Sequence, residues 1–285
     1  MTAALSNEYD PSIGALAQAC AITFQGNASN NLQQDAFFFF DNWYQEDLGV
    51  MAVTSVELPF CLAVSDGVAS SNYSQYCSKA VVKAISRLWS EQKSIRSEGI
   101  HQLINKTKHL SKRHGAAATL AMIVGELNSY GTIKATITHT GDSRVYWLPK
   151  GTAQWQCLTR DHNLLNELID QQAQEQGRQA KFSDYNLEGM AGSLYSITEC
   201  FALTTDDSYT SSEAPESISR TMDIDGGDCL LVCTDGIHDL VPSHEWQTVS
   251  AETDLQEWLI SLKNQVYDSD GNAYDNGTAI LLRFD

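Results

Sequence analysis

Hydrophobic and polar positions follow two kinds of pattern along this chain. Short apolar runs bounded by turn-forming residues predict strands, whereas apolar residues that recur every three or four positions predict helices. The strand-like runs cover residues 36–40, 60–64, 116–126, 131–140, 143–148, 196–203, 219–224, 228–234 and 278–284. The helical pattern covers residues 76–89, 98–113, 161–174 and 255–266.

The order of these elements predicts how they pack. Helices arrive in pairs and strands in runs, and the turn-like segments at 128–131 and 141–142 are too short for a parallel crossover. We therefore predict an α+β fold in which layers of antiparallel sheet are covered by helices. Periodicity leaves open whether there is one sheet or two. No repeat and no Pro/Gly/Ser-rich linker divides the sequence, so we expect a single domain over residues 1–285.

Composition and charge narrow the range of partners. The chain has 36 Asp and Glu against 18 Lys and Arg, a formal net charge of −18. Nucleic acids and anionic membrane surfaces would be repelled by such a field, so neither is expected as a partner. With 42% hydrophobic and 19% charged residues, the chain can bury a sizeable core.

Targeting signals and cysteine usage bear on the compartment. The first ten residues lack the basic and apolar regions of a signal peptide, and no apolar run approaches the roughly 18 residues that span a bilayer. Seven scattered cysteines form an odd number without a CxxC pair, which is typical of reduced, buried thiols. We therefore expect a cytoplasmic protein.

Several aspartates stand at the ends of strand-like runs and are the main candidates for chemistry. Asp66 closes an apolar run and precedes Gly67, Asp235 closes a similar run, and Asp142 and Asp275 also flank strands. Carboxylates on rigid strand ends suit hard divalent cations, which prefer oxygen ligands. Taken singly, each is more simply a turn residue, because Asp-Gly is a common turn pair.

The combination is more specific than any single aspartate. The relevant segments are Gln33-Gln-Asp-Ala36, Phe60-Cys-Leu-Ala-Val-Ser-Asp-Gly67, Thr140-Gly-Asp-Ser-Arg144, Leu158-Thr-Arg-Asp-His162, Gly227-Asp-Cys-Leu-Leu-Val-Cys-Thr-Asp-Gly236 and Asp275-Asn-Gly-Thr278. Together they resemble the successive motifs of the metal-dependent protein phosphatases of the protein phosphatase 2C type, and the first is similar to the motif of bacterial members. They occur in the family's order and cover residues 33 to 283.

The resemblance implies a fold and a metal site. The fold would be a four-layer α/β/β/α sandwich of two antiparallel sheets flanked by helix pairs, with two Mg²⁺ or Mn²⁺ ions at one end. By motif match, Asp66 would bridge the two ions and Gly67 would contribute its carbonyl. Asp235 and Asp275 would complete the ligand set of one ion, while Asp35 would support the other ion directly or through water.

Two further features follow from the same resemblance. Asp142, with help from Asp235, matches the position of a third and weaker ion in bacterial-type members. Residues 177–192 are polar and without a clear pattern, and they fall where the family carries its flap, a segment beside the site that is thought to touch the substrate.

The implied activity is hydrolysis of phosphoserine and phosphothreonine in proteins. Water activated by the two ions would attack phosphorus in line, with Asp66 and Asp235 as the catalytic residues, so that no nucleophilic side chain is needed. The expected partner is a phosphorylated protein, for example the substrate of a cognate serine/threonine kinase. The sequence leaves the oligomeric state open.

Three departures from the family pattern support a second hypothesis. Asn30 stands where the family usually has a phosphate-gripping Arg, Val68 stands near the place of a His that serves as general acid in animal members, and Glu199 replaces a later Arg. His162 is more simply a residue that pins a turn, so no general acid is assigned. The alternative is a catalytically weak, phosphatase-like binding or regulatory protein that retains its metal site. We prefer the phosphatase, because drift would also have eroded the scattered carboxylates.

Overall fold

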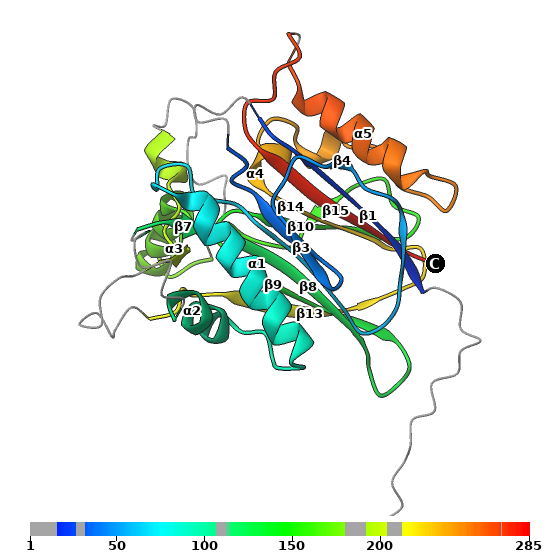
Figure 1. The fold of residues 1–285 in the computed structure, drawn as a ribbon, viewed down its shortest axis with the longest axis horizontal. Coiled ribbons are helices and arrows are strands. Elements are labelled where there is room, and N and C mark those ends of the chain that lie inside the picture. Colours follow the sequence, from blue (N-terminus) through cyan, green and yellow to red (C-terminus); the bar gives the residue numbers. More distant parts are fainter. Residues whose placement is uncertain are drawn as a thin grey trace, which may run out of the picture.

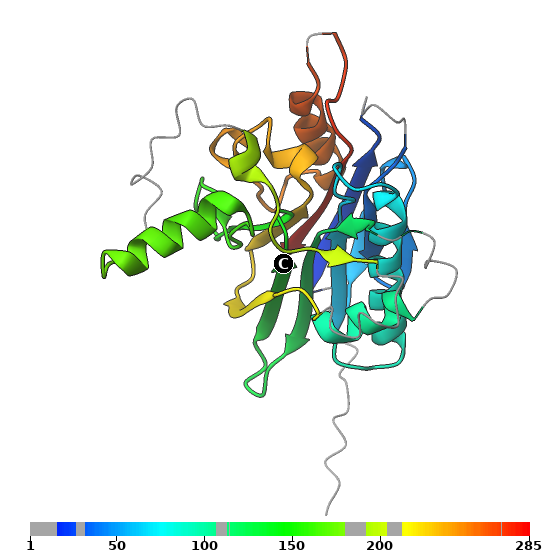
Figure 2. The same ribbon diagram turned by 90° about the vertical axis from the view of Figure 1, so that its left-hand side faces the viewer.

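The computed structural model describes residues 16–26, 32–106, 113, 115–179, 192–203, 213–268 and 270–285. Two large antiparallel sheets lie face to face in it, and helices cover their outer faces (Figures 1 and 2). Among the described residues, no helix combines the length and the apolar character needed to cross a bilayer.

The first sheet has the strand order β11-β10-β14-β15-β1-β4, with β5 also paired to β1. Its strands are β1 (Ala17–Phe24), β4 (Gly49–Val50), β5 (Thr54–Val56), β10 (Arg144–Leu148), β11 (Gln156–Cys157), β14 (Cys229–Cys233) and β15 (Gly277–Phe284). Residues far apart in the sequence meet here, since β1 pairs along its whole length with β15, from Ala17 opposite Phe284 to Phe24 opposite Gly277.

The second sheet has the order β13-β9-β8-β6-β2-β3. Its strands are β2 (Ala36–Phe39), β3 (Asn42–Tyr44), β6 (Phe60–Ser65), β8 (Leu120–Leu127), β9 (Ile133–Thr140) and β13 (Ile218–Ile224). A separate two-stranded sheet joins β7 (Ala117–Ala118) to β12 (Phe201–Ala202).

The helices pack on opposite sides of this pair of sheets. They are α1 (Ser74–Ser90), α2 (Ser97–Asn105), α3 (Leu164–Glu175), α4 (Asp235–His238) and α5 (Leu255–Val266), with short 3₁₀ turns η3 (Gly192–Tyr195) and η4 (Ser243–Glu245). α1 and α2 lie against the second sheet, α5 and the short α4 lie against the first, and α3 extends away from both sheets (Figure 2). The arrangement is an α/β/β/α sandwich.

Three apolar layers hold the sandwich together. Between the sheets, side chains such as Leu62 and Ile123 meet Leu230 and Leu282. Beneath α1 and α2 a second layer includes Ile85 from α1 and Phe38 from β2. Because side chains alternate along a strand, strands such as β1 and β6 supply the layer between the sheets with one face and an outer layer with the other.

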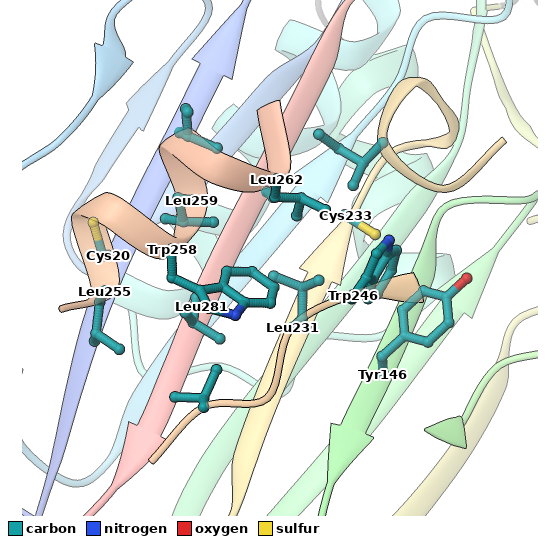
Figure 3. Packing of buried hydrophobic residues seen from close by; sticks show 14 of the residues in the cluster. Cys20, Tyr146, Leu231, Cys233, Trp246, Leu255, Trp258, Leu259, Leu262 and Leu281 are labelled. Carbon is teal, nitrogen blue, oxygen red and sulfur yellow. The ribbon is translucent and has the colours of Figure 1, made fainter. Parts of the chain in front are cut away.

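The third layer lies between α5 and the first sheet. It contains buried aromatic and aliphatic side chains, among them Trp258 and Leu259 from α5, Leu281 from β15 and Tyr146 from β10 (Figure 3). Tyr146 packs edge-on against Trp246 with ring centroids 4.7 Å apart. This packing fixes β14 and β15, whose ends carry two of the candidate aspartates.

The α+β sandwich predicted from the sequence is confirmed, but one strand was not predicted and the bounds of two elements need correction. β1 was missed because its inner face carries only Ala17, Ala19 and Ala21, which give a weak hydrophobic signal. The predicted helix 98–113 ends at Asn105, and residues 107–112 and 114 lie outside the described part. The predicted strand 196–203 is reduced to β12, with Ile197 making only an isolated bridge to Asn163.

Candidate metal centre

Five aspartates are brought together because the strands that carry them are neighbours. Asp35 precedes β2 and Asp66 follows β6, and these strands pair with Ala36 opposite Ser65. Asp142 precedes β10 and Asp235 follows β14, and these strands pair with Arg144 opposite Cys233. Asp275 comes just before β15, the strand next to β14. The antiparallel pairing therefore collects the carboxylates at one end of the sandwich.

A threonine connects the two sheets at this end. Thr234 donates its hydroxyl hydrogen to Asp35 Oδ2 over 2.8 Å, although the two residues are 199 positions apart. The backbone N–H of Thr278 donates in turn to Thr234 Oγ1 over 3.0 Å. Asp35, which is only 1% exposed, is thereby held from the second sheet against the ends of β14 and β15.

A second hydroxyl network holds the Asp66 loop. Its backbone N–H donates to Thr119 Oγ1 over 3.0 Å, and its carbonyl accepts from the Thr119 N–H over 2.8 Å. Thr119 Oγ1 also lies 2.7 Å from Ser143 Oγ, next to Asp142. The backbone N–H and the side chain of Thr119 both bond to the Asp66 loop. For this reason the predicted strand 116–126 is interrupted at Thr119.

Burial and mutual repulsion make these carboxylates hard to ionise. Loss of solvation raises the pKa of Asp35 to about 7. Loss of solvation, followed by the charge of Asp161, raises the pKa of Asp142 to about 7. The pKa values of Asp66 and Asp235 lie well above their usual range, first through burial and then through the charges of the neighbouring aspartates. Positive charge placed among them would relieve this penalty.

Buried carboxylate oxygens without hydrogen-bond partners are the kind of donor that suits a hard cation. Asp35 Oδ1, Asp142 Oδ1 and Asp235 Oδ1 are buried and have no hydrogen-bond partner. Buried polar atoms are nearly always paired, so three unpaired carboxylate oxygens in one place call for a ligand. Among the described residues, however, no three His, Cys, Asp or Glu side chains are placed together so that they could hold a metal ion. The fit therefore rests on the oxygen donors and their shared charge, which suit Mg²⁺ or Mn²⁺.

One acidic residue at this site was missed from the sequence. Asp239 lies one turn after Asp235, at the end of α4, and its charge raises the pKa values of Asp142, Asp235 and Asp275. The spacing of four residues was a usable signal, because side chains at i and i+4 share one helix face. From the sequence, Asp235 was placed at the end of a strand and no helix was predicted after it, so this spacing was not used.

The other residues singled out in the sequence differ in their positions and contacts. His162 does pin a turn. Its ring Nδ1 accepts a hydrogen bond from the Gly141 N–H over 3.1 Å, and its backbone N–H donates to the Gly141 carbonyl over 3.0 Å. Val68 donates its backbone N–H to the Ala117 carbonyl over 3.0 Å. Gly67 makes an isolated bridge to Ala118 beside Asp66. Asn30 and residues 180–191 of the expected flap lie outside the described residues.

Glu199 contributes to an acidic cavity close to the Asp142 turn. The cavity has a volume of about 430 Å³, and its lining includes Glu199, Glu213 and Glu216. Cys200 lies in the same wall, and burial together with the charges of Glu199 and Asp142 raises the pKa of its thiol. The position where the family pattern has a cation therefore carries negative charge next to the aspartate cluster.

Gly236 permits the close approach of α4 to the segment just before β15. A Cβ atom at this position would lie 1.9 Å from the carbonyl oxygen of Asn276. We expect Gly236→Ala to lower the free energy of unfolding by about 2–4 kcal/mol, because backbone must move apart. Urea denaturation measures this change. Gly99→Ala in α2 is the matched control, since its Cβ would contact Leu88 at an ordinary 3.5 Å. Equal effects of both substitutions would contradict the prediction.

The chain is similar to known proteins both in its sequence pattern and in its fold. The family model described as Protein phosphatase 2C matches residues 28–268. No curated protein matches the sequence. Among solved structures, the Mycobacterium tuberculosis serine/threonine phosphatase PstP/Ppp is 17% identical with a TM-score of 0.64, over 95% of this chain and 100% of that one.

Two other solved structures have similar folds. Serine/threonine phosphatase Stp1 from Staphylococcus aureus is 18% identical with a TM-score of 0.66, over 94% of each chain. PppA of Pseudomonas aeruginosa, described as a key regulatory component of T6SS, is 16% identical with a TM-score of 0.61, over 94% of this chain and 98% of that one. At these identities the similarity establishes the fold.

Proposed function

Since this chain belongs to the protein phosphatase 2C family, whose model matches residues 28–268, we propose that it is a metal-dependent serine/threonine protein phosphatase. One observation carries the proposal beyond family membership. Aspartates from separate strand ends share one end of the sandwich, and three of their buried carboxylate oxygens have no hydrogen-bond partner. Such a cluster costs stability unless cations occupy it.

We assign the metal-holding groups as the family motifs suggest. Asp66 would contact both of two Mg²⁺ or Mn²⁺ ions, and the Gly67 carbonyl would be a further ligand. Asp235 and Asp275 would complete the ligand set of one ion, and Asp35 would support the other directly or through water. A PstP catalytic domain of similar fold, with a TM-score of 0.55 and 18% identity, was solved in complex with two manganese ions. When bound, such ions lower the pKa of water and offset the charge of a phosphoryl group.

A third ion is proposed beside the first two. Asp142 and Asp235 would hold it, and Asp239 lies close enough for its charge to act on both. The unpartnered Oδ1 atoms of Asp142 and Asp235 support this assignment.

The protein's own side chains would act by holding the carboxylates in place. Thr234 and Thr119 fix Asp35 and the Asp66 loop through hydrogen bonds of 2.8 and 3.0 Å. Carboxylates fixed in this way need little reorganisation during the reaction, which is the main protein contribution when electrostatic stabilisation dominates. Asp66 and Asp235 are the residues we expect to be indispensable.

A phosphorylated protein is the substrate class we propose. PppA, a protein of similar fold, is described as a key regulatory component of T6SS, and a regulatory role of this kind is compatible with a phosphoprotein substrate for this chain. All seven cysteines are free, and this supports a reducing compartment such as the cytoplasm. A cognate serine/threonine kinase would supply the substrate.

Metal dependence is the first test of the proposed function. We expect the protein to release phosphate from 4-nitrophenyl phosphate and from a phosphothreonine peptide in the presence of Mn²⁺. We expect EDTA to reduce both rates to the uncatalysed background and added Mn²⁺ to restore them, because the aspartate cluster would lack its cations. Release that is insensitive to EDTA would contradict the mechanism. Background rates with Mn²⁺ present would instead favour a binding protein that retains the site.

A further inference from the structure

A buried histidine contacts the turn that carries Asp142. His238 lies in α4, three residues after Asp235, and its side chain is only 1% exposed. Its Nε2 atom is 3.1 Å from the Asp142 carbonyl oxygen. A carbonyl can only accept a hydrogen bond, so Nε2 carries the hydrogen and donates it. On the other side of the ring, Nδ1 lies 3.1 Å from Asp239 Oδ1.

The turn between β9 and β10 is held by two histidines. Gly141 has a φ of +89°, and its N–H and carbonyl are both bonded to His162. The next residue, Asp142, is bonded to His238 through its carbonyl. The pairing of β10 with β14 begins only at Arg144. Within the described residues, His238 is therefore the side chain whose hydrogen bond holds the Asp142 backbone itself.

This contact also joins two candidate ligands. His238 belongs to the same short helix as Asp235, and the loss of its hydrogen bond would let the Asp142 turn move relative to that helix. Replacing a residue that orients a metal ligand without contacting the metal itself typically lowers metal affinity by about 10–100-fold. The ring also lies 6.4 Å from that of Tyr146, so packing is a competing explanation of its burial.

We propose that His238 is a positioning residue that holds Asp142 toward a divalent cation shared with Asp235. The inference rests on the metal site of the proposed function, and it concerns the third, weaker ion of that site. His238 contacts neither substrate nor ion in this role. It acts through the Asp142 carbonyl.

Two substitutions separate hydrogen bonding from packing. His238→Gln places an amide nitrogen near the position of Nε2 and keeps a donor, whereas His238→Phe keeps a ring and removes it. We expect Phe to weaken Mn²⁺ binding to the weakest site by about 10-fold or more, and Gln to stay within about threefold of the wild type. His238→Met, a flexible apolar residue, replaces the Phe variant if the latter does not fold.

Calorimetric titration of the metal-free protein with Mn²⁺ is the primary measurement, because it does not require turnover. The Mn²⁺ concentration for half-maximal hydrolysis of 4-nitrophenyl phosphate is the second. His244→Phe is the matched control, since this histidine is 76% exposed and lies six residues further on. It should leave both quantities unchanged.

Three results would overturn the inference. Unchanged Mn²⁺ binding in the donorless variants would do so, as would a Gln variant as weak as the Phe variant, which would indicate packing. A wild type that binds no Mn²⁺ would remove the inference and the proposed function together. A wild type that binds Mn²⁺ without releasing phosphate contradicts the proposed function alone, and the calorimetric comparison still decides the role of His238.

Discussion

Asp66→Ala and Asp235→Ala are each expected to lower kcat/KM by at least about a thousandfold at saturating Mn²⁺, which corresponds to roughly 4 kcal/mol of transition-state stabilisation. Both side chains are assigned to more than one ion, so each substitution removes oxygen ligands from two positions at once. Their raised pKa values also indicate that neither carboxylate stabilises the metal-free fold through its charge. The loss should therefore appear in activity and metal affinity, with no loss of stability.

The measurement is the steady-state rate with 4-nitrophenyl phosphate and with a phosphothreonine peptide. Asp223→Ala, at an exposed position of β13 on the second sheet, is the control and should retain the wild-type rate. Circular dichroism and the midpoint of urea denaturation confirm that each variant is folded. If the wild type, Asp66→Ala and Asp235→Ala release phosphate equally slowly, the enzymatic function is contradicted and the regulatory alternative is favoured.

Asp35→Asn is expected to stabilise the metal-free protein at pH 8, by on the order of 2–4 kcal/mol. Burial raises the pKa of Asp35 from 3.8 to about 7, so the folded state disfavours the charged carboxylate that the unfolded chain carries freely. An Asn side chain can still accept the hydrogen bond of Thr234 through its oxygen. The same substitution should weaken Mn²⁺ binding, because it removes a negative charge from the cluster.

The metal-free protein is expected to lose stability as pH rises, because the folded state binds more protons than the unfolded chain. Between pH 4 and 7 the folded state keeps a proton on Asp35, and another on Asp142, that the unfolded chain has already released. The free energy of unfolding of the metal-free protein therefore falls as pH rises through this window. Asp35→Asn should flatten the fall. Mn²⁺ should raise the melting temperature more at pH 8 than at pH 5.5, because it no longer competes with protons.

Urea denaturation in EDTA at pH 5.5 and pH 8 tests the stability of the metal-free protein and its pH dependence. Melting temperatures measured with and without Mn²⁺ at the same two pH values test the effect of the ion. Asp223→Asn, an exposed aspartate changed in the same way, controls for the general effect of lowering the net charge of −18. The charge explanation fails if Asp35→Asn destabilises the metal-free protein at pH 8, or if its stability falls with pH as steeply as that of the wild type.

The aspartate cluster combines proposed cation binding with a lower stability of the metal-free protein. The cluster that is proposed to bind cations is the same cluster that makes the metal-free fold less stable above neutral pH. Binding sites often reduce stability in this way, because groups arranged for a ligand are poorly satisfied without it. The unpartnered oxygens of Asp35, Asp142 and Asp235 are the groups whose burial lowers the stability of the metal-free fold.

Local patterns were sufficient for much of the fold. The helical stripes at 76–89 and 255–266 became α1 and α5 within a few residues, and the antiparallel arrangement followed from short connections. Strands with bulky inner faces were recognised. β1 was not recognised, because its inner face carries three alanines. Only the pairing with β15 on one side and β5 on the other shows that this segment is a strand.

For the candidate site, the sequence by itself determined the residue types and their positions at strand ends, since an Asp-Gly pair after an apolar run is a local feature. The tertiary structure decided which carboxylates face one another, how far their pKa values rise, and that Asp239 and His238 belong to the same neighbourhood. These properties depend on distances between residues such as Asp35 and Thr234, which are 199 positions apart. Charge interaction and desolvation act through space, and no local pattern encodes them.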